Sequence, residues 1–483
     1  GNVNSYIYDD FDRVIAKTVG GDTIRYTNGL VVTYEYDEVN RLVREKILDK
    51  NGAPVVEYTY TLGAAGERVK VEETGAAFDR TVEYEYDALY RLVKETVTDD
   101  NGTTVTEYTY DRNSNRLTKT VDGVMTEYVY NELNQLVSET GISYEYDLNG
   151  NLVKKTEDNQ TTTYTYNAQN KLIRVTVHSG QQVNVEEYRY DYAGNRIAKI
   201  GELSTTYYLV DTNGALSQVL AEYDENSSLK TYYTRGAELI SQERNGTKSY
   251  YLYDGHDSVR VLTDENGAAT DFYTYDAFGN LIEQIGDTEN SYLYCGEQFD
   301  SFTGLYYLRA RYMNPSTGTF ITMDEYSGSV FEPVSLHKYL YANANPVMYS
   351  DPSGYNAAAL SLGGIGSAFA SYAIAIAPYA VASACAISIG LKMLNALLDL
   401  LFNVTITYSI IELQITALTA TDSNYAVAAM DMIVENMISS LQSIVDKKIN
   451  SKSKTPYTVY TLVDGSDNTV RYVGRTRNYE KRM

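Results

Sequence analysis

Two aspartates stand beside turn-forming residues in the stretch 296–355. Asp324 lies in ITMDEYSG, and Asp351 opens the sequence Asp-Pro-Ser-Gly-Tyr. The neighbouring turn residues could bring the two carboxylates together. Two carboxylates held close cannot both ionise, so one keeps a proton while the other polarises a water molecule, as in aspartic proteases. The pair could therefore carry out hydrolysis, and the alternative for an Asp before Pro is an ordinary turn.

A second set of residues that could do chemistry lies near the C-terminus. Tyr460 and Tyr472 fall in two β-type runs, TVYTLVD and TVRYVGRT, which the turn residues 465–468 join, and Arg482 follows. A tyrosine phenol can act as a base or relay, and an arginine can neutralise charge that grows on a phosphate. Residues 447–483 contain nine Lys or Arg against three Asp or Glu, which suits a phosphate backbone. The alternative is a plain β-hairpin.

A repeated phrase sets the elements that must position these residues. It reads Tyr-x-Tyr, then Asp or Asn with turn residues, then a polar residue and an apolar pair, with a spacing of roughly 16 to 26 residues between many copies. Each copy predicts a strand with both tyrosines on one face, a turn and a return strand. We expect one curved sheet, tyrosines along its inner face and no helix between residues 30 and 280. The copies start at Tyr6, Tyr34, Tyr84, Tyr108, Tyr128, Tyr144, Tyr164, Tyr188 and Tyr273.

The composition favours extensive β-structure in more than one domain. At 483 residues the chain exceeds what one core usually serves. It has 49 Tyr, 10 Phe and no Trp, and Tyr suits a sheet whose faces are half wet. The net charge of −24 argues against nucleic-acid binding by the whole chain but not by its basic tail. No basic, apolar leader of the kind found in signal peptides follows Gly1, and because the sequence does not start with Met we expect that upstream sequence was removed.

Cysteine and histidine offer little further chemistry. Cys295 and Cys385 lie in unlike segments, so they form neither a disulfide framework nor a zinc site. His178, His256 and His337 are scattered, and we expect structural roles for all three. The sequence contains no phosphate loop, zinc signature or Ser/His/Asp arrangement, and we expect no metal site in this chain.

After residue 355 the composition changes abruptly. Residues 357–391 contain no charged side chain over a length that could span a membrane. Small residues dominate, however, and Pro378 interrupts the run. Helical periodicity continues over 392–449. We expect helices that are shielded inside a shell and contact lipid only after release, with membrane translocation or a permanent anchor as alternatives.

The repeats and the stretch that follows them resemble known families. The tyrosine repeats match the YD repeats of Rhs, insecticidal toxin-complex and teneurin-like proteins, and residues 296–355 resemble the Rhs core-associated domain. The resemblance implies a mainly β fold, in which hairpins wind into a spiral shell that the core-associated domain plugs. It divides the chain into a shell (1–295), this plug (296–355), an apolar helical pre-toxin segment (356–449) and the start of a small α/β nuclease domain (450–483). We expect the shell to continue upstream.

In Rhs proteins an Asp-Pro-x-Gly motif marks self-cleavage of the shell from its C-terminal cargo. The resemblance implies that Asp324 and Asp351 form the catalytic dyad without a cofactor. It also implies that the bond between Tyr355 and Asn356 is the one that is cut.

The plug departs from the family pattern in two places. Tyr355 stands where the family usually has Leu or Met, and an aromatic ring can fill an apolar cleft as Leu does. Thr319 stands where the family usually has the Arg of Gly-Arg-Phe. Arg309 or Arg311 could supply that positive charge, or both could pair with carboxylates of the shell.

The basic tail resembles the opening of GIY-YIG endonucleases. Tyr460 stands in the first signature, Tyr472 in the second, and Arg482 at the place of the family's essential arginine. The family's Mg²⁺-binding Glu lies further on, so Mg²⁺ is expected for a complete nuclease. Since the sequence ends at Met483, we expect this chain alone to be inactive as a nuclease.

These features predict part of a secreted polymorphic toxin used in interbacterial competition. Its expected partners are its own C-terminal cargo, a cognate immunity protein, a secretion apparatus and the nucleic acid that the released toxin attacks. We expect it to be secreted or associated with the cell surface or cell wall, and its toxin to act in the cytoplasm of the target cell. The alternatives are a non-enzymatic surface adhesion protein and the carrier of an insecticidal toxin complex.

Overall fold

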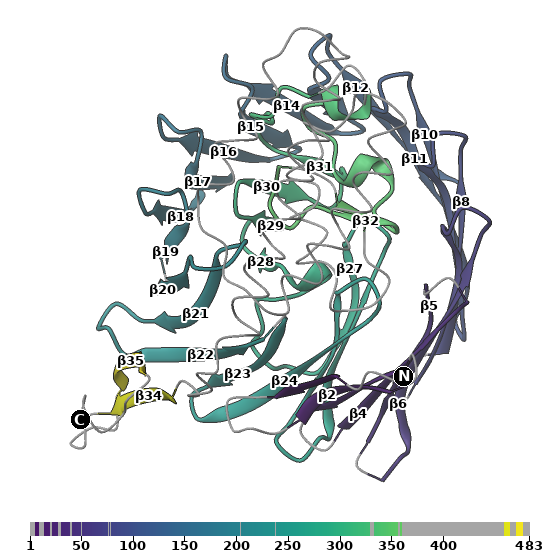
Figure 1. The fold of residues 1–483 in the computed structure, drawn as a ribbon. Coiled ribbons are helices and arrows are strands. Elements are labelled where there is room, and N and C mark those ends of the chain that lie inside the picture. Colours follow the sequence, from purple (N-terminus) through teal and green to yellow (C-terminus); the bar gives the residue numbers. More distant parts are fainter. Residues whose placement is uncertain are drawn as a thin grey trace, which may run out of the picture. The chain divides into compact units, whose positions relative to one another are not determined.

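The tyrosine repeats form one antiparallel sheet of 27 strands, in which each strand pairs with the next along the chain. The sheet curves in Figure 1, and its early strands approach β24 and β25. Side chains of β4–β6 share a core with Leu252 and Val261 of those two strands. Within the described residues from 30 to 280 the chain contains no helix. The prediction of a continuous curved sheet is therefore confirmed.

The structure, a computed structural model, describes residues 5–8, 14–19, 22–27, 30–38, 41–49, 51–75, 77, 79–202, 204–236, 238–328, 333–355, 358–359, 458–463 and 470–476. The chain divides into two compact units, Gly1–Pro378 and Tyr379–Met483. Asn356 and Arg482 lie outside the described residues.

The strands of the large sheet are mostly four to nine residues long. They are β1 (Ser5–Tyr8), β2 (Val14–Val19), β3 (Asp22–Thr27), β4 (Leu30–Tyr36), β5 (Leu42–Leu48), β6 (Pro54–Leu62), β7 (Arg68–Gly75), β8 (Asp79–Tyr86), β9 (Leu92–Asp99), β10 (Gly102–Tyr110), β11 (Arg116–Val121), β12 (Val124–Tyr130), β13 (Leu136–Glu139), β14 (Ile142–Tyr146), β15 (Leu152–Glu157), β16 (Gln160–Tyr166), β17 (Leu172–Ser179), β18 (Gln182–Tyr190), β19 (Arg196–Gly201), β20 (Thr205–Asp211), β21 (Gln218–Tyr223), β22 (Leu229–Arg235), β23 (Leu239–Arg244), β24 (Thr247–Tyr253), β25 (Val259–Thr263), β26 (Ala269–Tyr275) and β27 (Leu281–Ile285).

The Asp of each repeat holds its turn closed. In the copy that begins at Asp147, Oδ1 accepts the backbone N–H groups of Asn149 and Asn151, and Oδ2 accepts the side-chain amide of Asn151 at 2.9 Å. Gly150 adopts a left-handed φ of 80°, which a side chain would disfavour. The same bonds recur at Asp111, Asp191 and Asp276, and an Arg replaces the Asn after Asp87. The repeat is thus conserved within the chain because it encodes this turn.

In most repeats whose side chains are described, the two tyrosines lie on the inner face and have different roles. The first is buried, as at Tyr108 and Tyr188, which are each 2% exposed. The second donates its hydroxyl to a backbone carbonyl of an earlier hairpin, as Tyr110 does to Leu92 and Tyr190 to Leu172. The expectation of tyrosines along the inner face is confirmed, and the second tyrosine ties successive hairpins together.

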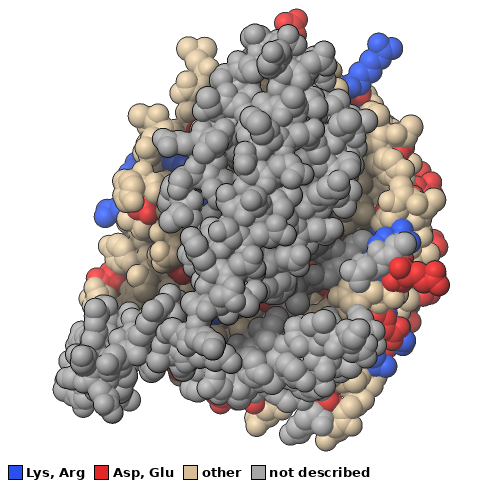
Figure 2. Space-filling view, in the orientation of Figure 1, with Lys and Arg blue, Asp and Glu red and all other residues tan. Residues whose placement is uncertain are grey.

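The residue between the two tyrosines faces outward and pairs across the strands. Glu145 lies opposite Lys154, and its carboxylate is 2.8 Å from the Lys ammonium. Glu85 and Lys94 repeat the pair at 3.0 Å. Figure 2 shows acidic and basic side chains interspersed on the described surface in that view. Such exposed pairs stabilise weakly but favour this register.

The plug follows the large sheet and lies within its curve in Figure 1, and its side chains pack on tyrosines of the sheet. Its Tyr307 and Tyr312 join a core with tyrosines of β12, β14, β16 and β18, and its Tyr306 and Phe320 join another with those of β22, β24 and β26. The elements are η1 (Tyr294–Gly296), β28 (Gln298–Asp300), β29 (Leu305–Leu308), β30 (Arg311–Asn314), β31 (Thr319–Phe320), η2 (Pro333–Leu336), η3 (Ala342–Ala344) and β32 (Tyr349–Ser350).

Little of the chain after the plug is described. Strand β33 (Ala358–Ala359) pairs with β32, so these two residues are extended where helix was expected, and the rest of the apolar segment lies outside the described residues. No helix in the described part of the chain has the length and apolar character that a membrane crossing needs.

The second unit contains a hairpin of β34 (Thr458–Val463) and β35 (Val470–Thr476), as the sequence predicts.

Candidate active site in the plug

A tight turn between β29 and β30 places two arginines beside the Asp-Pro-Ser-Gly motif. Arg309 takes a left-handed φ of 61° in this turn, and Arg311 opens β30. The backbone N–H of Ala310 donates to the carbonyl of Ser353 at 3.2 Å. At Gly354, where φ is 71°, a Cβ would lie 2.9 Å from the backbone nitrogen of Arg311. Only glycine therefore allows the motif to lie this close to the turn.

The guanidinium of Arg311 contacts both predicted catalytic aspartates. Its Nη2 lies 2.9 Å from Oδ2 of Asp324 and 3.4 Å from Oδ2 of Asp351. Because both Oδ2 atoms contact the same nitrogen, the distance between them cannot exceed the sum of these two distances. The structure brings together residues that are far apart along the plug, and Arg311 joins them.

The other atoms of Arg311 are also engaged. Nε donates to the carbonyl of Gly354, and Nη1 donates to the carbonyl of Lys338 at 3.3 Å. The guanidinium stacks over the ring of Phe320, 3.6 Å from its centroid. These contacts fix the plane of the guanidinium, so its position relative to the carboxylates is set by the backbone of the plug.

The two aspartates have different surroundings. Asp351 is 2% exposed, and its Oδ1 accepts the hydroxyl of Ser353 at 2.9 Å and the backbone N–H of Tyr355 at 3.1 Å. Asp324 accepts the backbone N–H of Tyr326 at 2.8 Å. Burial raises the pKa of Asp324 and the charge on Asp351 adds to that rise, although Arg311 opposes both. Asp324 is thus the carboxyl that holds a proton more readily than usual.

Tyr355 lies at the end of the described plug, with its backbone N–H bonded to Asp351 and its side chain 42% exposed. The sequence analysis allows the ring of Tyr355 to fill an apolar cleft as Leu would. The structure differs, because the residue is too exposed to lie in a closed cleft. Asn356 lies outside the described residues, but β33 follows at once and pairs with β32. The bond after Tyr355 therefore lies in the loop of a short hairpin whose arms are Tyr349–Ser350 and Ala358–Ala359.

Arg309 faces away from the aspartates and contacts other groups. Its Nη1 lies 2.8 Å from the carboxylate of Glu297 and also donates to the carbonyl of Pro352, while Nε donates to the carbonyl of Ser217 at 2.9 Å. Arg309 thus links Pro352 of the motif to Glu297 and to Ser217, which directly precedes β21 of the shell. Of the two arginines considered for the missing charge, Arg311 is the one that contacts the pair.

The sequence placed Ser353 and Gly354 in the cleavage motif, but it did not predict their contacts with Asp351 and Arg311 or the stacking of Phe320. The signal for Ser353 was present, because a Ser two residues after an Asp commonly bonds to it in a turn. The stacking of Phe320 on Arg311 depends on the pairing of β30 with β31 and has no local signal.

In the second unit only the hairpin backbone is described. Tyr460 lies opposite Gly474 and Tyr472 opposite Leu462, so both tyrosine positions fall on paired strands. The described residues hold no group of three His, Cys, Asp or Glu that could bind a metal ion.

Two kinds of comparison connect this geometry with known proteins. The family model for the teneurin YD-shell matches residues 24–347. Over 148 residues the chain is 38% identical to the tRNA3(Ser)-specific nuclease WapA of Bacillus spizizenii and 37% identical to the tRNA nuclease WapA of Bacillus subtilis. These matches cover 30% of this chain and 6% of each relative. Salivary gland surface protein 1 of Aedes aegypti is 31% identical over 170 residues, which are 32% of this chain and 5% of that protein.

Solved structures show the same fold. The crystal structure of TcdB2-TccC3-Cdc42 superposes with a TM-score of 0.58 at 18% sequence identity and covers 76% of this chain and 21% of that one. The chain thus spans only a small part of the proteins it resembles. Because the family model matches well over half of its residues, the chain belongs to the teneurin YD-shell family.

Proposed function

We propose that the chain is part of a polymorphic toxin, in which a YD shell encloses a C-terminal cargo and the plug frees that cargo by aspartyl self-cleavage between Tyr355 and Asn356. The observation that carries the proposal is the contact of Arg311 with both Asp324 and Asp351, beside the backbone of Tyr355. The proposed biological role of the toxin is competition between bacteria.

The surroundings of the two carboxylates suggest their roles. Asp351 accepts three hydrogen bonds that favour its charged form, so it acts as the base that takes a proton from the attacking water. Asp324, whose pKa is raised, donates its proton to the carbonyl oxygen of Tyr355 as the tetrahedral intermediate forms. Collapse of the intermediate breaks the C–N bond. The proton on Asp351 passes to the leaving nitrogen, which becomes the amine of Asn356, and the proton on the former carbonyl oxygen returns to Asp324 as the carboxyl group of Tyr355 forms. Water is consumed, and no cofactor is needed.

Arg311 has a positioning role in this scheme. It holds both carboxylates on one nitrogen and draws the carbonyl of Gly354 to the same place. Its positive charge also stabilises the dyad with one net negative charge, as the reaction requires. Arg309 holds Pro352 and so positions the motif without contacting the dyad.

The cargo proposed for this shell is a GIY-YIG-like nuclease. Tyr460 and Tyr472 would act as base or relay, and Arg482 would neutralise the phosphate. Two relatives are named as tRNA nucleases, which supports a nucleic acid as the target. The described strands of the hairpin, TVYTLV and VRYVGRT, contain no carboxylate of the kind that Mg²⁺ prefers, so these residues alone do not make a site for the Mg²⁺ of a complete nuclease.

The remaining partners follow from this role. A nuclease toxin needs a cognate immunity protein in the producing cell and a secretion apparatus to leave it. We place the shell outside the cell or on its surface or wall, and the released toxin in the cytoplasm of the target. Residues 357–391 would contact lipid only after release.

The proposal is tested by following the purified full chain. Mass spectrometry should find a new N-terminus at Asn356 in the wild type, and Asp324→Asn and Asp351→Asn should each leave the chain uncut. Asp147→Asn, in an ordinary repeat turn, is the matched control and should still be cut. Cleavage by both active-site variants, or an intact wild type after long incubation, would contradict self-cleavage.

A carrier of an insecticidal toxin complex is the second candidate, because the fold matches the TcdB2-TccC3-Cdc42 structure. Both candidates predict self-cleavage, so the released cargo distinguishes them. Nucleic acid degraded by the cargo supports the first, and modification of a host protein supports the second.

A further inference from the structure

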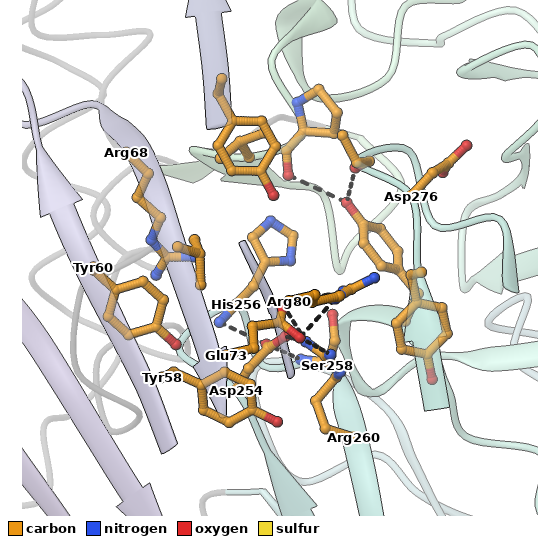
Figure 3. Close-up of a pocket in the computed structure, with 17 residues that line it drawn as sticks. Tyr58, Tyr60, Arg68, Glu73, Arg80, Asp254, His256, Ser258, Arg260 and Asp276 are labelled. Atoms are coloured by element: carbon orange, nitrogen blue, oxygen red, sulfur yellow. Dashed lines mark hydrogen bonds and ion pairs between the residues drawn. The ribbon is translucent and has the colours of Figure 1, made fainter. Parts of the chain in front are cut away.

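A buried pocket lies where three parts of the first unit meet. It is lined by β6–β8, by the loop that follows β24, and by Pro346 and Val347 of the plug (Figure 3). Its volume is about 60 Å³, where a single water molecule needs roughly 10 to 15 Å³. Six charged side chains line it: Arg68, Glu73, Arg80, Asp254, Arg260 and Asp276.

Two of the three arginines in the pocket have carboxylate partners. Arg80 binds Glu73 through Nε at 2.8 Å, and Arg260 binds the same carboxylate at 2.6 Å. Arg260 also contacts Asp254 at 2.9 Å. The carboxylates on this side of the pocket are therefore already neutralised by Arg80 and Arg260.

Arg68 differs from both. It is 3% exposed, and no carboxylate of the described residues lies within ion-pair distance of it. Its Nη2 donates to the carbonyl of Gly255, its guanidinium lies 4.6 Å from the ring centroid of Tyr60, and its Nε has no hydrogen-bond partner among the described atoms. A guanidinium stays charged at any physiological pH, so burying one without a counter-charge is strongly unfavourable.

His256 lines the same pocket as Arg68 and is neutral, so it brings no counter-charge. It is 7% exposed, and its Nδ1 lies 3.3 Å from the thiol of Cys295. Burial and, after it, the charge of Arg68 lower the pKa of His256 to about 4. The ring is thus neutral at pH 7, and when Nδ1 accepts the thiol proton, Nε2 carries the hydrogen. The backbone of Pro346 also forms a hydrogen bond with the His256 ring that opposes this lowering of the pKa.

We propose that this pocket binds a small inorganic anion, which balances the buried charge of Arg68 and accepts hydrogen bonds from its guanidinium. The volume leaves room for chloride or a tetrahedral oxyanion. The proposal is independent of self-cleavage, because Arg68 contacts neither Asp324 nor Asp351.

The anion would stabilise the junction between shell and plug. Arg68 opens β7, its backbone N–H donates to the sulfur of Met348 in the plug at 3.2 Å, and Gly255 belongs to the loop after β24. An anion on Arg68 therefore acts where the early hairpins, the late hairpins and the plug come together.

The first test locates the anion in the full chain. Crystals grown in sodium bromide should show an anomalous peak in the pocket, within hydrogen-bond distance of the Arg68 guanidinium. Density for water alone, or for a carboxylate side chain of this protein in the pocket, would overturn the proposal.

The second test measures the effect in solution. At equal ionic strength, replacing sodium gluconate by sodium chloride, bromide or sulfate should raise the Tm of the wild type by a few degrees with saturation at millimolar anion. Arg68→Gln removes the charge and should abolish the rise, while Arg44→Gln, which loses an exposed arginine, should keep it. An equal rise in both variants means a general salt effect and would overturn the proposal. If Arg68→Gln does not fold, saturation in the wild type together with the bromide position still decides the matter.

Discussion

Arg260 on β25 and Glu73 on β7 lie 187 residues apart in the sequence and form a buried ion pair, with Nη2 2.6 Å from Oε2. Both side chains are 4% exposed, and Arg80 binds the same carboxylate. The pair can form only because the sheet curves far enough for early and late strands to meet. The ion pair is therefore direct evidence that the sheet curves.

Replacing Glu73 by Gln should destabilise the shell strongly. The change keeps the size of the side chain but leaves Arg80 and Arg260 buried without their common counter-charge. Removing one partner of a buried pair costs about 3 to 5 kcal/mol. The free energy of unfolding in urea should fall by that amount. Glu145→Gln, which breaks an exposed pair with Lys154, should cost less than about 1 kcal/mol, and an equal loss in both variants would contradict a special role for the buried pair.

Acid should weaken the contact between plug and shell through His337. Its Nδ1 accepts the backbone N–H groups of Tyr339 and Leu340, and Nε2 donates to Asn115 of the shell at 2.9 Å. Burial lowers the pKa of His337 to about 4. The unfolded chain takes up this proton near pH 6.5 and the folded chain only near 4, so stability is lost as pH falls through that window, by at most about 3 kcal/mol.

Unfolding curves between pH 7 and 4 would check this. His337→Asn keeps an acceptor near the position of Nδ1 but does not titrate, so its stability should fall less steeply with acid than that of the wild type. His178→Asn, at an exposed strand position, should follow the wild type. Parallel curves for all three proteins would mean that His337 is not the sensor.

The local parts of this fold could be predicted from sequence because each repeat carries its own instructions. The Asp that closes the turn, the residue with positive φ and the amide or guanidinium that returns to the Asp all lie within five positions. The partners of the turn tip could not be predicted. Leu133 and Phe278 occupy the same turn position and donate the same backbone bond, yet Leu133 is 68% exposed and Phe278 is 1% exposed. Only the curvature of the sheet distinguishes them.

Truncating that turn residue should therefore cost much more stability in one repeat than in the other. Phe278 packs edge-on against Tyr108 with ring centroids 5.3 Å apart, and the guanidinium of Arg116 lies 4.2 Å from its centroid. Phe278→Ala should lower the free energy of unfolding by about 3 to 5 kcal/mol. Leu133→Ala should change it by less than about 0.5 kcal/mol. Thermal or urea unfolding would show the contrast, and a small effect at Phe278 would mean that its pocket collapses around the missing ring.

The two aspartates of the candidate site could be predicted from sequence, but the arginine that contacts them could not. The motifs identify Asp324 and Asp351. The sequence could not decide between Arg309 and Arg311, because both lie at the same turn and differ only in the direction in which their side chains point. The structure separates them, because Arg309 contacts Glu297 and Arg311 contacts the aspartates.

The contacts of Arg311 with both aspartates predict that self-cleavage depends on its guanidinium group. Arg311→Lys keeps the positive charge, but one ammonium cannot reach Asp324, Asp351 and the carbonyls of Gly354 and Lys338 together. Loss of this geometry should slow self-cleavage by about 100-fold or more, measured as the rate at which the Asn356 N-terminus appears. The unfolding midpoint, measured in the same preparation, should fall only modestly because the charge is kept. Arg174→Lys, at an exposed pair on β17, should cleave at the wild-type rate. Wild-type cleavage by Arg311→Lys would show that the guanidinium geometry is dispensable, and the dyad would then have to be organised by the backbone and Ser353 alone.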